Sequence, residues 1–146
     1  MMISNYMRDE HRSCDTMFAG AEEAVALGEW DVAEKRFLEF SSETLTHFKK
    51  EEDELFVVFE AQTGSSEGPT QVMCFEHDQV RGLIGKMAEA IESQDRDSYL
   101  SLAESMMILL QQHNMKEEQM LYAMCDRVLP PELRESTLEK MKATTL

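Results

Sequence analysis

Four stretches of the chain carry apolar residues at every third or fourth position, and segments that break helices separate them. This spacing places the apolar side chains on one face of an α-helix, and no stretch shows the alternation of a strand. The breaks fall at Gly28, at residues 63–69, at residues 93–97 and at Pro130–Pro131. Long amphipathic helices with short connections pack most economically against one another in antiparallel order. The sequence therefore predicts an all-α, antiparallel up-down-up-down four-helix bundle.

The length of the chain suits one domain, because domains cluster near 100–150 residues and 146 residues can bury one core. We expect the bundle to occupy residues 5–129 and residues 131–146 to form a short C-terminal helix or tail. A dimeric coiled coil would show similar spacing, but the regular breaks favour a bundle formed within one chain. The oligomeric state is left open by the sequence.

The net charge of the chain limits the classes of partner that it can bind. Lysine and arginine number 14 against 29 acidic residues, a net charge of -15 that repels nucleic-acid phosphates and anionic lipid heads. No apolar run approaches the roughly 20 residues of a membrane span, and residues 1–10 lack the apolar segment of a secretory signal. We therefore expect a cytoplasmic protein with no nucleic-acid or membrane partner. The three cysteines, without CxxC spacing, are expected to be free thiols.

Each predicted helix carries one of the four histidines, and each histidine interrupts an apolar stripe. A single buried histidine is more often a hydrogen-bonded core residue than a metal ligand, but four in one core favour a shared site. The first two lie about 17 and 19 residues from Gly28, and the last two about 18 residues from Asp95. Antiparallel neighbours equally distant from a turn lie at the same height, here roughly 27 Å from it. The rings that can converge are those of His11, His47, His77 and His113.

Two carboxylates share the faces of these histidines, because Glu51 and Glu117 each follow a histidine by four positions. Burying them uncompensated would cost on the order of several kcal/mol, and the stripes hold no lysine or arginine beside them. A metal is the natural counter-charge. Four imidazoles and two carboxylates suit two cations, with iron or manganese favoured and zinc as the main competitor. The predicted metal ligands are His11, His47, Glu51, His77, His113 and Glu117.

Other side chains are candidates for supporting this site. Three acidic residues lie one turn from a histidine or beside one and are expected either to accept a hydrogen bond from a ring or to be solvated: Asp15, Glu43 and Glu76. Two tyrosines reach the site or lie at the edge of the bundle: Tyr6 and Tyr122. Four methionines line an apolar pocket around the metals or pack as ordinary core: Met73, Met106, Met120 and Met124.

The ligand pattern resembles the hemerythrin-like, or HHE cation-binding, family over nearly the whole chain. The residues that carry the resemblance are His11, His47xxxGlu51, His77 and His113xxxGlu117. The resemblance implies a four-helix bundle around two iron ions, with Glu51 and Glu117 bridging them beside an oxo or hydroxo group. It also implies reversible interaction with O2 or NO.

The chain departs from the family's oxygen carriers on the third helix. Carriers have a HxxxH pair there, whereas Met73 precedes His77 by one turn in this sequence. Carriers divide five histidines three and two, so that one iron keeps a vacancy, and four histidines imply a division of two and two. The four-histidine, two-glutamate set is similar to the di-iron domain of iron-sulfur cluster repair proteins.

These observations favour a non-haem di-iron protein that binds O2 or NO for sensing, storage or delivery, with a cellular reductant as a possible partner. No catalytic set such as Ser-His-Asp and no phosphate loop is present. One alternative is a di-iron enzyme that acts on peroxide or NO, or an iron donor in cluster repair. Another is a structural bundle whose histidines hold zinc or no metal.

Overall fold

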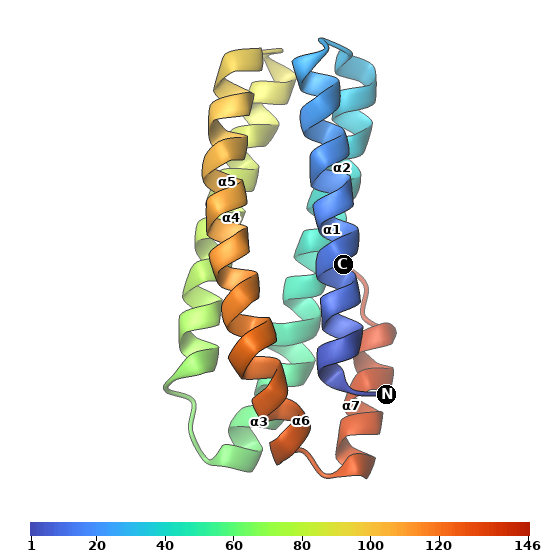
Figure 1. The fold of residues 1–146 in the computed structure, drawn as a ribbon, viewed down its shortest axis with the longest axis vertical. Helices are drawn as coiled ribbons and strands as arrows, with labels where there is room; N and C mark the ends of the chain where they lie inside the picture. Colours follow the sequence, from blue (N-terminus) through green and yellow to red (C-terminus); the bar gives the residue numbers. More distant parts are fainter.

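The computed structural model describes residues 1–146, and it contains helices and no strands. Four long helical runs lie antiparallel, and a short C-terminal helix lies against the side of the bundle near one end (Figure 1). This confirms the predicted all-α four-helix bundle with a short C-terminal helix. The runs are α1 (Ile3–Ala26), then α2 (Trp30–Lys49) with η1 (Lys50–Leu55) and α3 (Phe56–Thr63), then α4 (Pro69–Glu92), then α5 (Arg96–Lys116) with η2 (Glu117–Leu121) and α6 (Tyr122–Val128), and finally α7 (Pro131–Lys142).

The α1–α2 and α4–α5 turns lie at the same end of the bundle and are built alike (Figure 1). Each contains one residue with positive φ, Gly28 at 72° and Gln94 at 53°. Glycine adopts this left-handed conformation without steric cost, whereas glutamine occupies it less readily. In both turns the next residue donates its backbone N–H to a carbonyl five positions earlier, Glu29 to Ala24 and Asp95 to Ala90. Two matching helical hairpins therefore make up the bundle.

The two hairpins repeat each other in register. A step of 66 positions leads from residue 28 to residue 94, and the same step leads from His11 to His77 and from His47 to His113. Most paired core positions hold different residues, such as Phe40 and Met106. The repeat therefore lies in the geometry of the helices and in the site residues, not in overall sequence identity.

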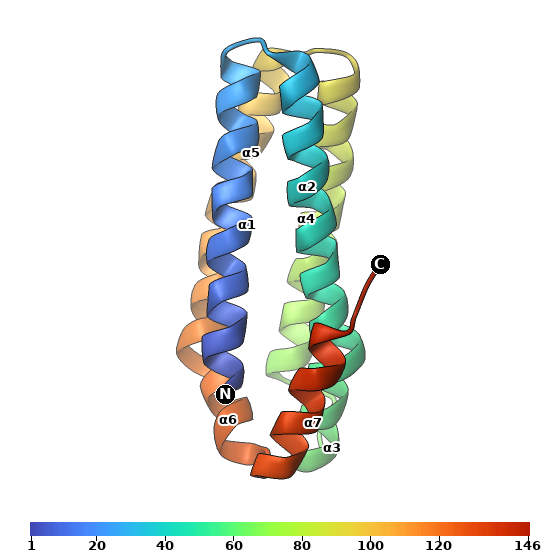
Figure 2. The same ribbon diagram turned by 90° about the vertical axis from the view of Figure 1, so that its right-hand side faces the viewer.

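The apolar core is divided into two blocks. The upper cluster has 17 buried residues near the two matching turns, among them Phe18, Phe40 and Tyr99. The lower cluster has 12 at the opposite end, where α7 contributes Leu138 and Met141. Figure 2 shows α7 lying along that end of the bundle. A belt of polar residues remains between the two blocks, and it is shielded from water at both ends.

Helical runs two and four each contain one π-helical turn at this belt. The backbone N–H of Phe56 donates to the carbonyl of Glu51, and the N–H of Tyr122 donates to that of Glu117. Such a bond spans five residues instead of four, and isolated π turns occur frequently at functional sites. Glu117 is the first residue of its π turn, and Glu51 is the second residue of the other.

The extra residue in each π turn shifts the buried face by one position. Beyond the fourth-run turn, Leu121 is buried whereas Met120 is 51% exposed. The expectation that Met120 lines the core is therefore wrong, because the apolar stripe assumed an unbroken period of 3.6 residues. Met73 and Met106 are buried as expected. Among all these helices, none combines the length and the apolar character that spanning a bilayer requires.

Candidate metal centre

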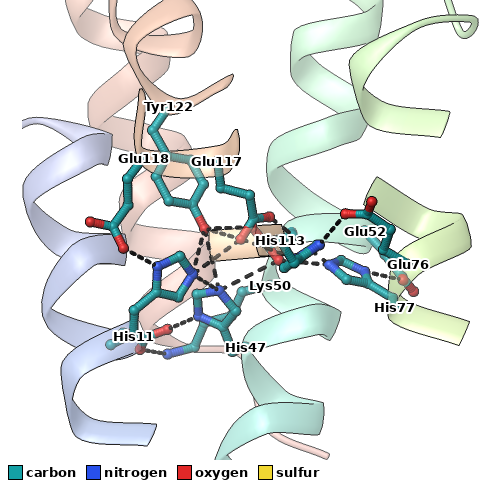
Figure 3. Close-up of polar contacts among 12 residues, drawn as sticks. His11, His47, Lys50, Glu52, Glu76, His77, His113, Glu117, Glu118 and Tyr122 are labelled. Carbon is teal, nitrogen blue, oxygen red and sulfur yellow. Dashed lines mark hydrogen bonds and ion pairs between the residues drawn. The ribbon is translucent and has the colours of Figure 1, made fainter. Parts of the chain in front are cut away.

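The six residues expected to bind metal meet in the polar belt between the two core clusters (Figure 3). They come from all four helical runs. Each is buried, with at most 4% of its surface exposed. The residues so placed are His11 on α1, His47 on α2, Glu51 on η1, His77 on α4, His113 on α5 and Glu117 on η2.

The histidines form two facing pairs, one in each hairpin. The Nε2 atoms of His11 and His47 are 3.1 Å apart, and the rings of His77 and His113 have centroids 4.9 Å apart. Both pairs lie level because their members are almost equally distant from their turn, and a helix rises by a constant amount per residue. The sequence-based arithmetic of heights is therefore confirmed for both hairpins.

The two carboxylates lie between the pairs. Glu117 Oε1 is 3.1 Å from Nε2 of His11 and 3.2 Å from Nε2 of His113. Glu51 Oε1 is 3.5 Å from Nε2 of His47 and 3.1 Å from Nε2 of His77. Each glutamate thus contacts one histidine of each hairpin. A carboxylate with this placement can bind two cations at once.

Two groups of donor atoms that could each hold a metal ion are fully buried, and a third, partly exposed group of Glu52, Cys74 and His77 shares His77 with one of them. One buried group contains Glu51, His77, His113 and Glu117, and the other contains His11, His47 and Glu117. All donor atoms within a group lie within 4.8 Å of one another. Glu117 belongs to both groups, so the arrangement suits a pair of ions that share it.

Unpartnered polar atoms test whether a metal fits here. Four buried atoms of the site have no hydrogen-bond partner: Glu51 Oε1, His77 Nε2, His113 Nε2 and Glu117 Oε2. A buried polar atom without a partner costs about 1–3 kcal/mol. All four are lone-pair donors from nitrogen or oxygen, which is the ligand chemistry of iron, manganese and zinc. A cation would satisfy them together, so these residues fit a bound metal.

Every histidine is held from outside the site by a second glutamate. In each case the ring Nδ1 lies 2.6–2.9 Å from a carboxylate on a different helical run. An Nδ1–H that donates outward leaves the Nε2 lone pair facing the centre, which orients the ring and raises its basicity as a ligand. The pairs are His11 with Glu118, His47 with Glu10, His77 with Glu52 and His113 with Glu76.

These partners differ from those that the sequence suggested. Asp15 and Glu43 are exposed and make no hydrogen bond to a histidine. Glu76 does support the site, but it bonds His113 and not its neighbour His77. The physical reason is that Nε2 points toward the bundle axis, which turns Nδ1 toward an adjacent helix. The usable signal is a glutamate directly beside a site residue, repeated after 66 positions at residues 10 and 76.

Each supporting glutamate also meets a lysine or arginine. Lys50 is buried and bonds Glu10, and Arg81 lies 2.8 Å from Glu52. Burial by itself would raise the pKa of Glu10, but its contacts with His47 and Lys50 outweigh burial and lower the pKa to about 2. Glu10 is thus held ionised. The remaining pairs are Lys116 with Glu76 and Arg8 with Glu118.

The central carboxylates control the protonation of the histidines. Burial by itself would lower the pKa of His11 and His77, but hydrogen bonds and charges from the glutamates raise both to about 9. Burial and the charge of Glu117 raise the pKa of Glu51. Without a cation, protons therefore collect in the centre to balance its negative charge. A metal would take the place of those protons.

Tyr122 is a site residue that the sequence did not separate from the bundle edge. It is fully buried, and its hydroxyl donates to Glu51 Oε2 at 2.6 Å and to Glu117 Oε1 at 2.9 Å. The same oxygen lies 3.2 Å from Nε2 of His11 and 3.3 Å from Nε2 of His47. The π turn brings it there, because Tyr122 directly follows η2.

Glu76→Gln is expected to weaken metal binding about 10–100-fold, because the amide accepts a weaker hydrogen bond from His113 and no longer fixes the ring. The matched control is Glu89→Gln, an exposed position on the same helix, which should leave the affinity unchanged. Competition with a chelator measures both affinities. Equal affinities for the two variants would contradict the supporting role of Glu76.

The comparison with known families gives one match. The family model described as "Hemerythrin HHE cation binding domain" matches residues 2–125 of the chain. No curated protein and no solved structure matches the chain. The matched range includes all six buried residues of the centre.

Proposed function

We propose a function from one premise: the chain belongs to the hemerythrin family, whose domain binds cations through histidine and glutamate. We infer that the protein holds two iron ions and binds O2 or NO reversibly, for sensing, storage or delivery. The observation that carries the proposal is the pair of buried donor groups that share Glu117. The other polar residues of the belt support these donors and form no separate catalytic set.

The donor set suits iron, and the same nitrogen and oxygen chemistry also suits manganese and zinc. It contains nitrogen and carboxylate oxygen but no thiolate, since the free cysteines lie outside the two buried donor groups. Two histidines and a shared carboxylate for each ion also leave fewer protein donors than the six that octahedral coordination accepts. When bound, the iron pair supplies a redox-active centre at which a diatomic gas can coordinate.

The protein's own residues shape and protect this centre. The outward bonds from the histidine Nδ1 atoms fix the ring orientations before any ligand arrives. Phe48 stacks on His77 with ring centroids 3.9 Å apart, and Phe56 lies parallel to the same ring at 6.0 Å. These apolar walls exclude water from the His77 side and favour a small ligand of low polarity.

The size of the site argues against an organic substrate. The six residues are almost entirely buried, and none of the larger surface grooves is lined by any of them. One of these grooves is lined by Glu52 and Arg81, which form the ion pair on the outer side of His77. Only a very small molecule can reach the centre without rearrangement of the bundle.

The proposal is tested by metal analysis and absorption spectra of protein purified without added metal. We expect two irons per chain and a stoichiometric spectral change when O2 or NO is added to the reduced protein, reversed when the gas is removed. Zinc or no metal, or a spectrum that the gases leave unchanged, would overturn the proposal. Repeated consumption of NO or peroxide in the presence of a reductant would identify an enzyme instead of a binding protein.

A further inference from the structure

The internal repeat places Tyr122 and Phe56 at equivalent positions. The step of 66 leads from residue 56 to residue 122, and each residue directly follows a π turn. Their rings face equivalent histidines: Tyr122 lies 5.6 Å from His11 and Phe56 lies 6.0 Å from His77, measured between ring centroids. The two halves of the centre therefore differ by one hydroxyl group.

That hydroxyl lies beside the histidine pair of only one of the two donor groups. Tyr122 Oη is 3.2 Å from Nε2 of His11 and 3.3 Å from Nε2 of His47, and it also bonds Glu117, the third member of that group, and Glu51 of the other group. Figure 3 shows the Tyr122 side chain directed at this histidine pair, with His77 on the far side of Glu117. The oxygen thus lies where a fourth donor of the group would lie.

The other donor group has no such oxygen. Nε2 of His77 and Nε2 of His113 have no hydrogen-bond partner, and the equivalent ring is the phenyl group of Phe56. Met73, one turn before His77, is buried in the lower cluster, as is its equivalent Met7. The His77 and His113 group instead has a second carboxylate, Glu51, so the Tyr122 oxygen gives the His11 and His47 group the same number of donors.

We propose that the Tyr122 oxygen binds the metal held by His11 and His47. This inference rests on the proposed two-iron site. The phenol oxygen forms the bond to the metal, and the phenol proton leaves to solvent. The protein then has seven donor residues, four for each ion with Glu117 shared.

The test uses the visible spectrum of the iron(III)-loaded protein, because phenolate bound to iron(III) gives a charge-transfer band and enhanced tyrosinate vibrations in resonance Raman spectra. We expect this band in the unmodified protein and its complete loss in Tyr122→Phe. Absence of the band from the unmodified protein, or its retention in Tyr122→Phe, would overturn the inference.

The other two tyrosines provide matched controls. Tyr99 is buried in the upper cluster and Tyr6 bonds Lys50, so neither contacts the donor groups. The double variant Tyr6→Phe/Tyr99→Phe leaves Tyr122 as the only tyrosine and must keep the whole band. This variant decides the question even if Tyr122→Phe fails to hold iron, since loss of the band from it contradicts the assignment.

The tyrosinate band needs no O2 or NO, so its absence counts against this inference alone, and a failure to bind either gas counts against the proposed function alone.

Discussion

Glu117→Ala is expected to remove both metal ions from the protein. Its carboxylate is the one donor that belongs to both groups, within 3.2 Å of a histidine from each hairpin. Loss of a shared ligand weakens the binding of both ions at once, whereas loss of a histidine removes a donor from one group only. Metal analysis of the purified variant should find almost no bound metal, in contrast to the unmodified protein. Far-ultraviolet circular dichroism establishes whether the variant is still helical, because removing one member of a buried charge cluster leaves its histidine partners uncompensated and lowers stability.

The control for this loss is Cys14→Ser. Cys14 is half-buried on α1, three positions from His11, and it contributes to neither donor group. It should therefore keep the full metal content. If Glu117→Ala retained either ion at the level of this control, the shared position of Glu117 would not be the basis of the site.

The free energy of unfolding of the metal-free protein is expected to fall as pH rises from about 6.5 to about 9. The pKa of His11 and of His77 is about 9 in the folded chain and near 6.5 when unfolded. Groups with a raised folded pKa stabilise fully below the unfolded value and lose that contribution as pH rises through the folded one. The raised pKa of Glu51 acts in the same direction. The expected loss is on the order of a few kcal/mol, measured by urea unfolding.

The metal-loaded protein is the control, because its histidines hold a cation in place of protons and its stability should not fall over this range. Glu10, whose pKa is about 2, loses its contribution only in acid and does not affect the comparison. A metal-free protein whose stability stayed constant or rose between these pH values would contradict the proton balance of the centre.

The convergence of the six residues was predictable because it depends on helix geometry alone. Equal distances from Gly28 place His11 beside His47, and the i, i+4 relation adds Glu51 to the same face. These relations hold for any straight antiparallel hairpin. They need no knowledge of side-chain torsions or of the distance between helices.

The supporting residues were not predictable by the same reasoning. Glu43 follows the same one-turn rule as Glu51, but it is exposed, since the partner of His47 comes from α1. Which neighbouring helix a ring faces depends on its side-chain torsions and on the order of packing around the bundle. The position of Tyr122 depended in turn on a π turn, whose single added residue no periodic pattern reveals.

Each histidine pair is grouped with a glutamate from the other hairpin, so metal binding is coupled to the relative motion of the two hairpins. The His11 and His47 pair completes its group with Glu117 from the other hairpin, and the His77 and His113 pair takes Glu51 in the same way. A bound ion would therefore be a cross-link between two hairpins that are otherwise joined by one loop, by packing and by hydrogen bonds such as those of His11 to Glu118 and His77 to Glu52. Any breathing motion that parts them must break metal–ligand bonds, so the rate of metal release reports how often the two halves separate.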